Sequence, residues 1–224
     1  MRKVTFILGA LLLLVTACTP EETGYKWREE WDHGQPGGGG DDTPGLPEIK
    51  GKPRYVWVDA AANFSYYAND AAYIAEDCKR IAAMGFTDLV VDVRPTSGDV
   101  LFTSSVAPPC LKCAAWVNGK YRWVERTATF DYLAAFIEAG HAAGLRVNAG
   151  INTMVGGYHS SIGDVGMLYD HPERKSWGAV DNLAAGLTNT MDDADTGPRF
   201  LDPANADVQA FLLKIGRASC RERV

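Results

Sequence analysis

The sequence predicts an α/β fold, the N-terminal part of a (β/α)8 barrel of the TIM type with about three βα units. Between residues 51 and 214, short apolar runs alternate with helical patterns, which is typical of a parallel sheet with helices outside. Each expected helix leads into the next strand through a single glycine, whereas the strand-to-helix connections are long. The elaboration therefore lies at the carboxyl ends of the strands, where such a barrel keeps its active site.

The elements of residues 51–214 are predicted in order from apolar runs and helix-capping residues. The strands are residues 55–60, 86–94 and 145–151, each a short apolar run. The first helix begins at Asn69 or Asp70, the second at Thr129 or Asp131 and the third near residues 203–205, since such side chains accept from the free N–H groups of a first turn. The connections that remain are residues 61–69, 95–126 and 152–203.

The segment before residue 51 indicates export. Arg2 and Lys3 precede an apolar run of about twelve residues, short of the roughly 20 that span a bilayer, so residues 1–17 are interpreted as a signal peptide. The run ends at Cys18 in VTAC, which resembles the lipobox of bacterial lipoproteins, and an ordinary secretory signal is the alternative. Residues 18–50, rich in Gly, Pro and acidic residues, predict a flexible tether. We therefore expect a cell-envelope protein, anchored to the outer membrane through lipid on Cys18 and facing the periplasm or the surface.

The last ten residues, 215–224, are not expected to belong to the fold. They interrupt the helical pattern that precedes them, and they resemble the translation of a common DNA sequencing adapter. We interpret them as an artefactual tail, which is excluded from fold reasoning. The natural sequence is then expected to continue beyond Lys214.

The charge balance argues against nucleic acid as a partner. The chain carries 22 Lys and Arg against 28 Asp and Glu, a formal net charge of −6. Nucleic-acid binding rests on Lys and Arg that neutralise phosphates, and residues 51–214 hold no basic cluster. We expect a neutral or small partner.

Polar side chains stand at or just beyond the ends of the expected strands. Arg94 can present a fork of donors to hydroxyls or a carboxylate, and a structural pairing with Asp92 or Asp99 is an equal alternative. Asn152 can donate and accept at a sugar hydroxyl or can shape a turn. For Asp59, Asp92 and Asp99, a solvated or salt-bridged role is expected rather than acid/base catalysis.

Aromatic side chains crowd the two longest connections. Flat rings beside polar groups form a platform for a pyranose ring, and the alternative for each ring is to pack its own loop. We expect half of them to do only that. They are Phe102, Trp116, Tyr121 and Trp123 in one connection, and Tyr158, Tyr169 and Trp177 in the other.

Cys110 and Cys113 form a lone CxxC motif. Zinc would need a second pair of ligands, and His159 and His171 are too far apart in sequence to supply one. We therefore expect no metal and no cofactor. In an exported protein a short loop disulfide between the two cysteines is the expected state, with free thiols or a metal site as the alternatives.

Four motifs occur in order along residues 51–214. They are VDVRPTSGDVLFTS at 91–104, FDYLAAFIEAGHAAGLRVNAGIN at 130–152, DHPE at 170–173 and LDP at 201–203. In order and spacing they resemble the glycosyl-hydrolase-like 10 family of bacterial lipoproteins, and the R-P-x-x-G-D element is the most specific of them. The resemblance implies a (β/α)8 glycosidase that hydrolyses a glycosidic bond in a polysaccharide or cell-wall glycan.

The resemblance also implies where the glycan binds. The substrate-binding positions that it implies are Arg94, Asp99, Asn152 and Asp202. Gly150 and Thr153 stand where the family usually has Trp and Pro, so one aromatic wall of the sugar site is missing.

The catalytic residues are not identified by the sequence. Glycosidases generally need two carboxyl groups, and the strand of the family that supplies an acidic residue would follow Lys214. We therefore expect this chain to be inactive and a longer parent to be active. The alternative is a surface lipoprotein that binds glycans on the same scaffold without cutting them.

Overall fold

The computed structural model describes residues 52–183 and 186–221. All of them belong to Leu46–Val224, one of the two units into which the chain divides. The predictions of a signal peptide at residues 1–17, a tether at 18–50 and acylation at Cys18 lie outside the described residues. None of the described helices combines the length and the apolar character that crossing a membrane requires.

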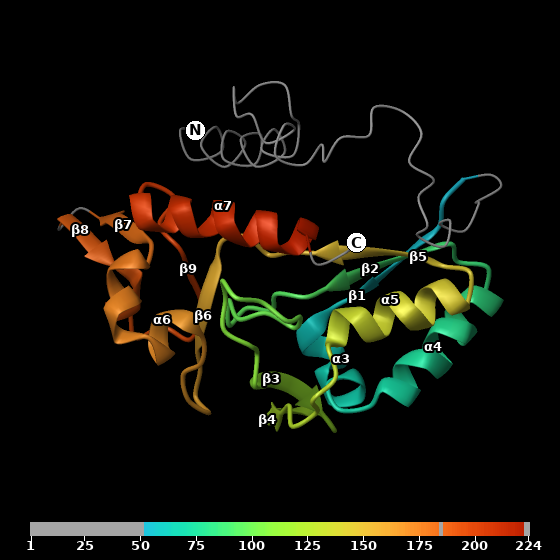
Figure 1. The fold of residues 1–224 in the computed structure, drawn as a ribbon. Helices are drawn as coiled ribbons and strands as arrows, with labels where there is room; N and C mark the ends of the chain where they lie inside the picture. Colours follow the sequence, from blue (N-terminus) through green and yellow to red (C-terminus); the bar gives the residue numbers. More distant parts are fainter. Residues whose placement is uncertain (1–51, 184–185, 222–224) are drawn as a thin grey trace, which may run out of the picture. The chain divides into compact units, whose positions relative to one another are not determined.

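The three predicted strands form one parallel sheet in the order β1-β2-β5 (Figure 1). Strand β1 spans Tyr55–Val58, β2 spans Asp88–Asp92 and β5 spans Arg146–Gly150. Within the described part of the chain this sheet has three strands and does not close on itself. The fold is therefore mixed α/β as expected, and the (β/α)8 barrel stays a prediction.

The helices that connect these strands begin where the sequence predicts. Helix α4 (Ala71–Ala83) is capped by Asp70, whose side chain accepts from the N–H of Tyr73, and α5 (Tyr132–Ala142) is capped by Asp131 in the same way. Beyond each helix a glycine takes a left-handed backbone, Gly85 at φ +87° and Gly144 at φ +80°, where other residues would be strained. Local sequence signals alone thus place these two helices.

One helix lies where a loop was expected. Helix α3 (Ala60–Tyr67) follows β1 directly and is capped by Asp59, which accepts from the N–H of Ala62 at 2.7 Å. Its buried residues are Ala60, Phe64 and Tyr67, a spacing of four and three that puts them on one face. The connection after β1 is therefore part of the core.

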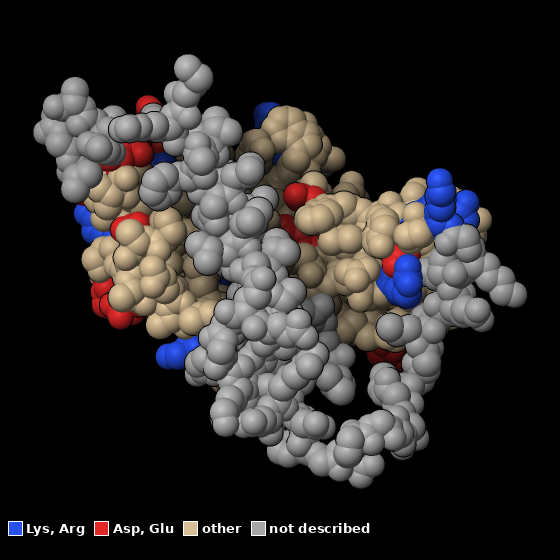
Figure 2. All heavy atoms as spheres, turned by 90° about the horizontal axis from the view of Figure 1, so that it is seen from above, with Lys and Arg blue, Asp and Glu red and all other residues tan. Residues whose placement is uncertain are grey.

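The main core lies between the sheet and helices α4 and α5 (Figure 1). Leu89 and Val91 of β2 and Ile74 of α4 are fully buried, and Phe136 of α5 is 1% exposed. Side chains that alternate with these along the strands point to the other face, where Trp57 is 62% exposed. Among the described residues visible in Figure 2, those other than Lys, Arg, Asp and Glu make up most of the surface, with small groups of basic and acidic residues between them.

The connection after β2 contains a hairpin that the sequence analysis did not predict. Strand β3 (Lys112–Val117) pairs antiparallel with β4 (Lys120–Glu125). Asn118 and Gly119 join them with φ of +51° and +76°, the positive values that a tight two-residue hairpin turn needs.

The connection after β5 is also more ordered than expected. Two antiparallel pairs form, β6 with β9 and β7 with β8. Its elements are β6 (Val155–His159), α6 (Met167–Asp170), η1 (Pro172–Trp177), β7 (Val180–Leu183), β8 (Gly186–Asn189), η2 (Thr190–Asp192) and β9 (Gly197–Phe200).

The last helix, α7 (Ala206–Arg221), begins where predicted, with Asn205 accepting from the N–H groups of Asp207 and Val208. Its expected end at Lys214 is wrong, because the helix continues and Ile215 is 1% exposed. Val208, Phe211 and Ile215 are spaced three and four apart and are all buried, so the apolar stripe of the helix runs past residue 214. That residues 215–224 are not native stays a prediction.

Candidate functional site

Two carboxylates stand level at the ends of neighbouring strands. Val58 and Val91 are paired in register in β1 and β2, so Asp59 and Asp92, the next residues along, lie side by side at the carboxyl edge. Neighbouring strands are about 4.8 Å apart, and residues at one register position project to the same face. The sequence analysis placed each residue at a strand end, and the register brings them together.

Asp92 is buried and fully engaged in hydrogen bonds. It is 4% exposed, Oδ1 accepts from the N–H of Arg94 at 3.0 Å, and Oδ2 accepts from Nδ2 of Asn152 at 3.0 Å. Burial raises the pKa of Asp92, the hydrogen bond from Arg94 opposes that rise, and the charge of Asp59 adds to it. Asp92 thus holds Asn152 in place and couples electrostatically to Asp59.

Asn152 lies at the same edge, as predicted, just beyond β5. Its Nδ2 donates to Asp92 Oδ2 and to the carbonyl oxygen of Arg94 at 3.1 Å, so both amide hydrogens are used. Its side-chain oxygen accepts no hydrogen bond from the described residues, and the residue is exposed. Asn152 therefore presents an acceptor to solvent.

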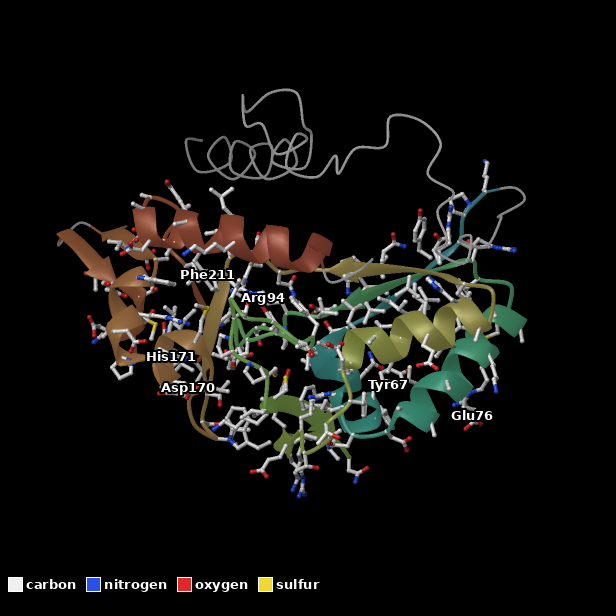
Figure 3. The ribbon with its side chains drawn as sticks, in the orientation of Figure 1. Tyr67, Glu76, Arg94, Asp170, His171 and Phe211 are labelled. Atoms are coloured by element: carbon white, nitrogen blue, oxygen red, sulfur yellow. The ribbon has the colours of Figure 1, made fainter. Side chains whose placement is uncertain are left out.

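Arg94 does not reach the surface, contrary to its expected contact with a ligand. Its guanidinium is fully buried and donates to the main-chain oxygens of Gly98 and Thr153, both at 2.9 Å, and of Asn152. Burial lowers the pKa of Arg94 to about 10. Its carbon Cζ lies 5.8 Å from the centre of the Phe211 ring of α7 (Figure 3). The guanidinium of Arg94 thus donates to main-chain carbonyls, and the charges of Asp99 and Asp92, the carboxylates considered as the alternative, act on it as well.

Asp99 is a buried acid rather than a group that faces a ligand. It is 7% exposed, and burial, followed by the charge of Asp170, raises its pKa to about 7, while Arg94, Ser97 and Arg174 oppose the rise. Asp170 ends α6 and is labelled in Figure 3. The acid can exchange a proton near neutral pH, but its burial separates it from solvent.

Asp202 shapes the turn before α7. Its Oδ1 accepts from the N–H of Ala204 at 2.8 Å, and its own N–H donates to the carbonyl of Trp177 at 2.7 Å. None of these bonds reaches Asp59, Asp92 or Asn152. The structure therefore gives Asp202 a local role instead of joining it to the carboxyl edge.

Cys110 and Cys113 are free, buried thiols, which differs from the expected disulfide. Each sulfur contacts a different main-chain carbonyl, that of Lys112 for Cys110 and that of Ala114 for Cys113. Cys113 also lies in the β3–β4 ladder, opposite Val124. Across residues 52–183 and 186–221 no cluster of three or more His, Cys, Asp or Glu could hold a metal ion.

The aromatic side chains of the two long connections range from buried to exposed. Phe102 is 6% exposed, and Trp177 packs on Phe211 with ring centres 5.5 Å apart. Trp116 and Tyr121 are instead exposed, at 56% and 61%. The sequence did not predict which of these rings turn inward, because that depends on the β3–β4 hairpin, in which alternate residues point to opposite faces.

Comparison with known proteins supports the fold class. No protein-family model matches the chain, and no curated protein matches it. Among solved structures, α-L-fucosidase isoenzyme 2 from Paenibacillus thiaminolyticus is similar with a TM-score of 0.52 and 16% identity, over 75% of this chain and 22% of that one. The GH36 α-galactosidase AgaB from Geobacillus stearothermophilus matches with a TM-score of 0.41 and 14% identity, over 75% of this chain and 19% of that one.

The fold of this chain is therefore similar to part of the fucosidase, and the chain spans 22% of the length of that protein. The resemblance to the glycosyl-hydrolase-like 10 family stays a prediction, because no family model matches.

Proposed function

We propose that the chain forms part of a glycoside hydrolase that binds a polysaccharide or cell-wall glycan at the carboxyl edge of β1, β2 and β5. The observation that carries the proposal is the set of Asp59, Asp92 and Asn152 at the ends of three adjacent parallel strands, where Asp59 and Asp92 are level and Asn152, two residues beyond Gly150, reaches Asp92 with its amide. The likeness of the fold to part of a glycosidase supports it.

Two acceptors in this set are free to meet sugar hydroxyls. Asp59 is exposed and uses Oδ1 to cap α3, which leaves Oδ2 available. Asn152 is exposed and leaves its side-chain oxygen available. Hydroxyl groups donate readily to such oxygens, and bonds to a charged acceptor are the stronger ones. Asp92 acts as a positioning residue, because it holds the amide of Asn152.

Hydrolysis is proposed for the longer parent, with the catalytic carboxyls not assigned to residues of this chain. A second candidate is a surface lipoprotein that binds the glycan without cutting it. The burial of Asp92 favours this candidate, because only Asp59 of the pair is exposed to a ligand, whereas a glycosidase generally works with two carboxyls.

The experiment compares Asp59→Asn with the wild-type chain. It measures retention on polysaccharides and the release of reducing ends. Asparagine caps helices as well as aspartate does, so α3 should keep its stability while the charged acceptor is lost. We expect glycan binding to weaken about tenfold, the effect of one charge-assisted hydrogen bond. Asp70→Asn is the matched control, since Asp70 is an exposed cap of α4. Equal glycan binding by Asp59→Asn and by the wild-type chain would mean that the sugar does not contact Asp59.

We also propose that Cys18 is acylated and anchors the protein in the cell envelope. The VTAC sequence at the end of a short apolar run supports this, and each buried CH₂ of an acyl chain contributes about 0.8 kcal/mol to membrane binding. Mass spectrometry of the mature N-terminus should find lipid on Cys18 and none in Cys18→Ala. A Cys18→Ala protein that still partitions into detergent would contradict the proposal.

A further inference from the structure

The outer face of the β3–β4 hairpin carries two exposed aromatic rings side by side. Trp116 and Tyr121 are directly opposite each other in the ladder, with ring centres 5.0 Å apart and ring planes at 81°. Both are more than half exposed. The next pair on this face is Ala114 with Trp123, and the last is Lys112 with Glu125.

Three features fix the position of the hairpin that carries the rings. Its inner face is packed into the core, with Cys113 at 3% and Ala115 at 1% exposure. Its turn is a tight pair, Asn118 and Gly119. Nε1 of Trp123 donates to the carbonyl of Ile162 at 2.6 Å, which connects the hairpin to the turn that follows β6. A ligand that bound the rings would therefore not have to order them first.

The chemistry of this face suits a sugar ring. Aromatic faces carry negative quadrupole charge, and the C–H groups on one side of a pyranose carry partial positive charge, so the two stack. Because the ring planes of Trp116 and Tyr121 stand at 81°, a sugar ring stacks on the face of one of them and borders the other. Exposed apolar rings also gain by leaving water. Lys112 and Glu125, at one end of the same face, supply a donor and an acceptor for hydroxyls.

The size of the face is too small for a stable protein partner. Six residues per strand at about 3.4 Å each give a length of about 20 Å, and two strands give a width of about 10 Å. The face is then about 200 Å², against roughly 800 Å² on each partner of a stable protein interface. A few sugar units of an extended chain match that length.

We propose that the outer face of the β3–β4 hairpin is a second glycan-binding site, which takes a neutral glycan chain with a pyranose unit held against the Trp116–Tyr121 pair. The inference rests on the proposed function. The site is separate from the carboxyl edge, because Cys113 on the inner face of the hairpin is the residue on which the charges of Asp59 and Asp92 act, while the two rings lie on the opposite, exposed face. It would hold a polymer to the protein without contacting Asp59 or Asn152.

The test is retention of the full chain on insoluble cellulose, xylan, mannan and chitin, with Trp fluorescence titration by soluble oligosaccharides of the polymer that is retained. We expect Trp116→Ala and Tyr121→Ala each to weaken binding about tenfold. Trp116→Phe should keep most of the binding, since it keeps a flat ring, and Trp116→Leu should lose it. Tyr66→Ala is the matched control, because Tyr66 is also 56% exposed but lies on α3.

The result separates this inference from the proposed function. Loss of binding in Trp116→Ala with binding kept in Asp59→Asn supports the hairpin site. Loss in Asp59→Asn with binding kept in Trp116→Ala overturns the hairpin site and leaves the carboxyl edge standing. Binding that Trp116→Leu retains would mean that the face recognises apolar surface rather than sugar, and it overturns the inference. Concentration-dependent self-association that Trp116→Ala abolishes, with no retention on any polymer, would also overturn it.

Discussion

The sheet with its two helices and the two long connections are ordered by different means. In the first region, helices α4 and α5 begin at their own caps, end at their own glycines and bury apolar residues beneath β2. In the second, Arg94 joins the end of β2 to the carbonyls of residues 152 and 153, and Trp123 joins the hairpin to residue 162. Local signals build the first region, whereas long-range hydrogen bonds and buried apolar residues such as Leu101 and Leu168 hold the second.

This difference explains why the candidate binding surfaces lie in or beside the second region. Asn152 and the exposed rings of the hairpin are placed by contacts between segments far apart in sequence. A substitution at one of these contacts should therefore weaken the docking of a connection more than it weakens the sheet. The following predictions use that sensitivity, from the largest expected effect to the smallest.

Removal of the Arg94 guanidinium should destabilise the second region most. Arg94→Leu leaves three main-chain carbonyl oxygens, one buried and two partly buried, without their donor. Unsatisfied groups of this kind are costly, so we expect a loss of about 3–5 kcal/mol in the free energy of unfolding. Arg94→Lys should also destabilise, because an ammonium lacks the planar fork. Urea unfolding measures the loss, and hydrogen exchange should show residues 152–170 opening before β2. Wild-type stability in Arg94→Lys would show instead that the guanidinium is not a structural tie.

The ionisation of Asp99 should make the second region less stable as the pH rises. Its folded pKa of about 7 lies above the usual value of 3.8, so the fold favours the protonated acid. That stability is fully present below about pH 4 and is lost as the pH rises to about 7. Asp99→Asn cannot ionise, so its free energy of unfolding should rise relative to that of the wild type over this window, by up to about 4 kcal/mol. Thermal unfolding from pH 4 to 8 measures it, and parallel curves for the two proteins would contradict it.

A side chain at Gly98 should push the segment that follows β2 away from strand β6, with which it is in contact. Gly98 has φ +80°, and a Cβ there would lie 2.8 Å from the carbonyl oxygen of Val155. Gly98→Ala should therefore cost about 2–3 kcal/mol, from backbone strain and from the clash. Gly119→Ala is the matched control, since Gly119 has φ +76° and no heavy atom within 4 Å of its Cβ position. Denaturant unfolding of both variants isolates the contact, and equal losses would show that strain alone acts.

The smallest effect on stability is expected at the exposed rings. Trp116→Ala removes a side chain that is 56% exposed, so the free energy of unfolding should change by no more than about 0.5 kcal/mol. Its melting temperature, measured beside that of Leu89→Ala in the first region, checks this. Leu89 is fully buried, so Leu89→Ala should lower the free energy of unfolding by about 2–5 kcal/mol. A large loss in Trp116→Ala would mean that the ring supports the hairpin rather than a ligand.

The sequence by itself determined the elements whose signals lie within about four residues. Asp70 and Asp131 cap their helices, Gly85 and Gly144 end them, and each signal acts on its own main chain. The parallel pairing of the three strands followed from the alternation of helix and strand. Helix α3 carried the same kind of signal in the spacing of Ala60, Phe64 and Tyr67, but it is only eight residues long and was missed.

Only the tertiary structure decided what the polar and aromatic residues do. Arg94 stands at a strand end in either role, and its burial under Phe211 settles which partners it meets. Asp59 and Asp92 become neighbours through strand register, and Trp116 becomes exposed because the other face of its hairpin is packed. The physical reason is that a side chain's solvent access and partners depend on segments distant in sequence, whereas caps and turns depend on the residues beside them.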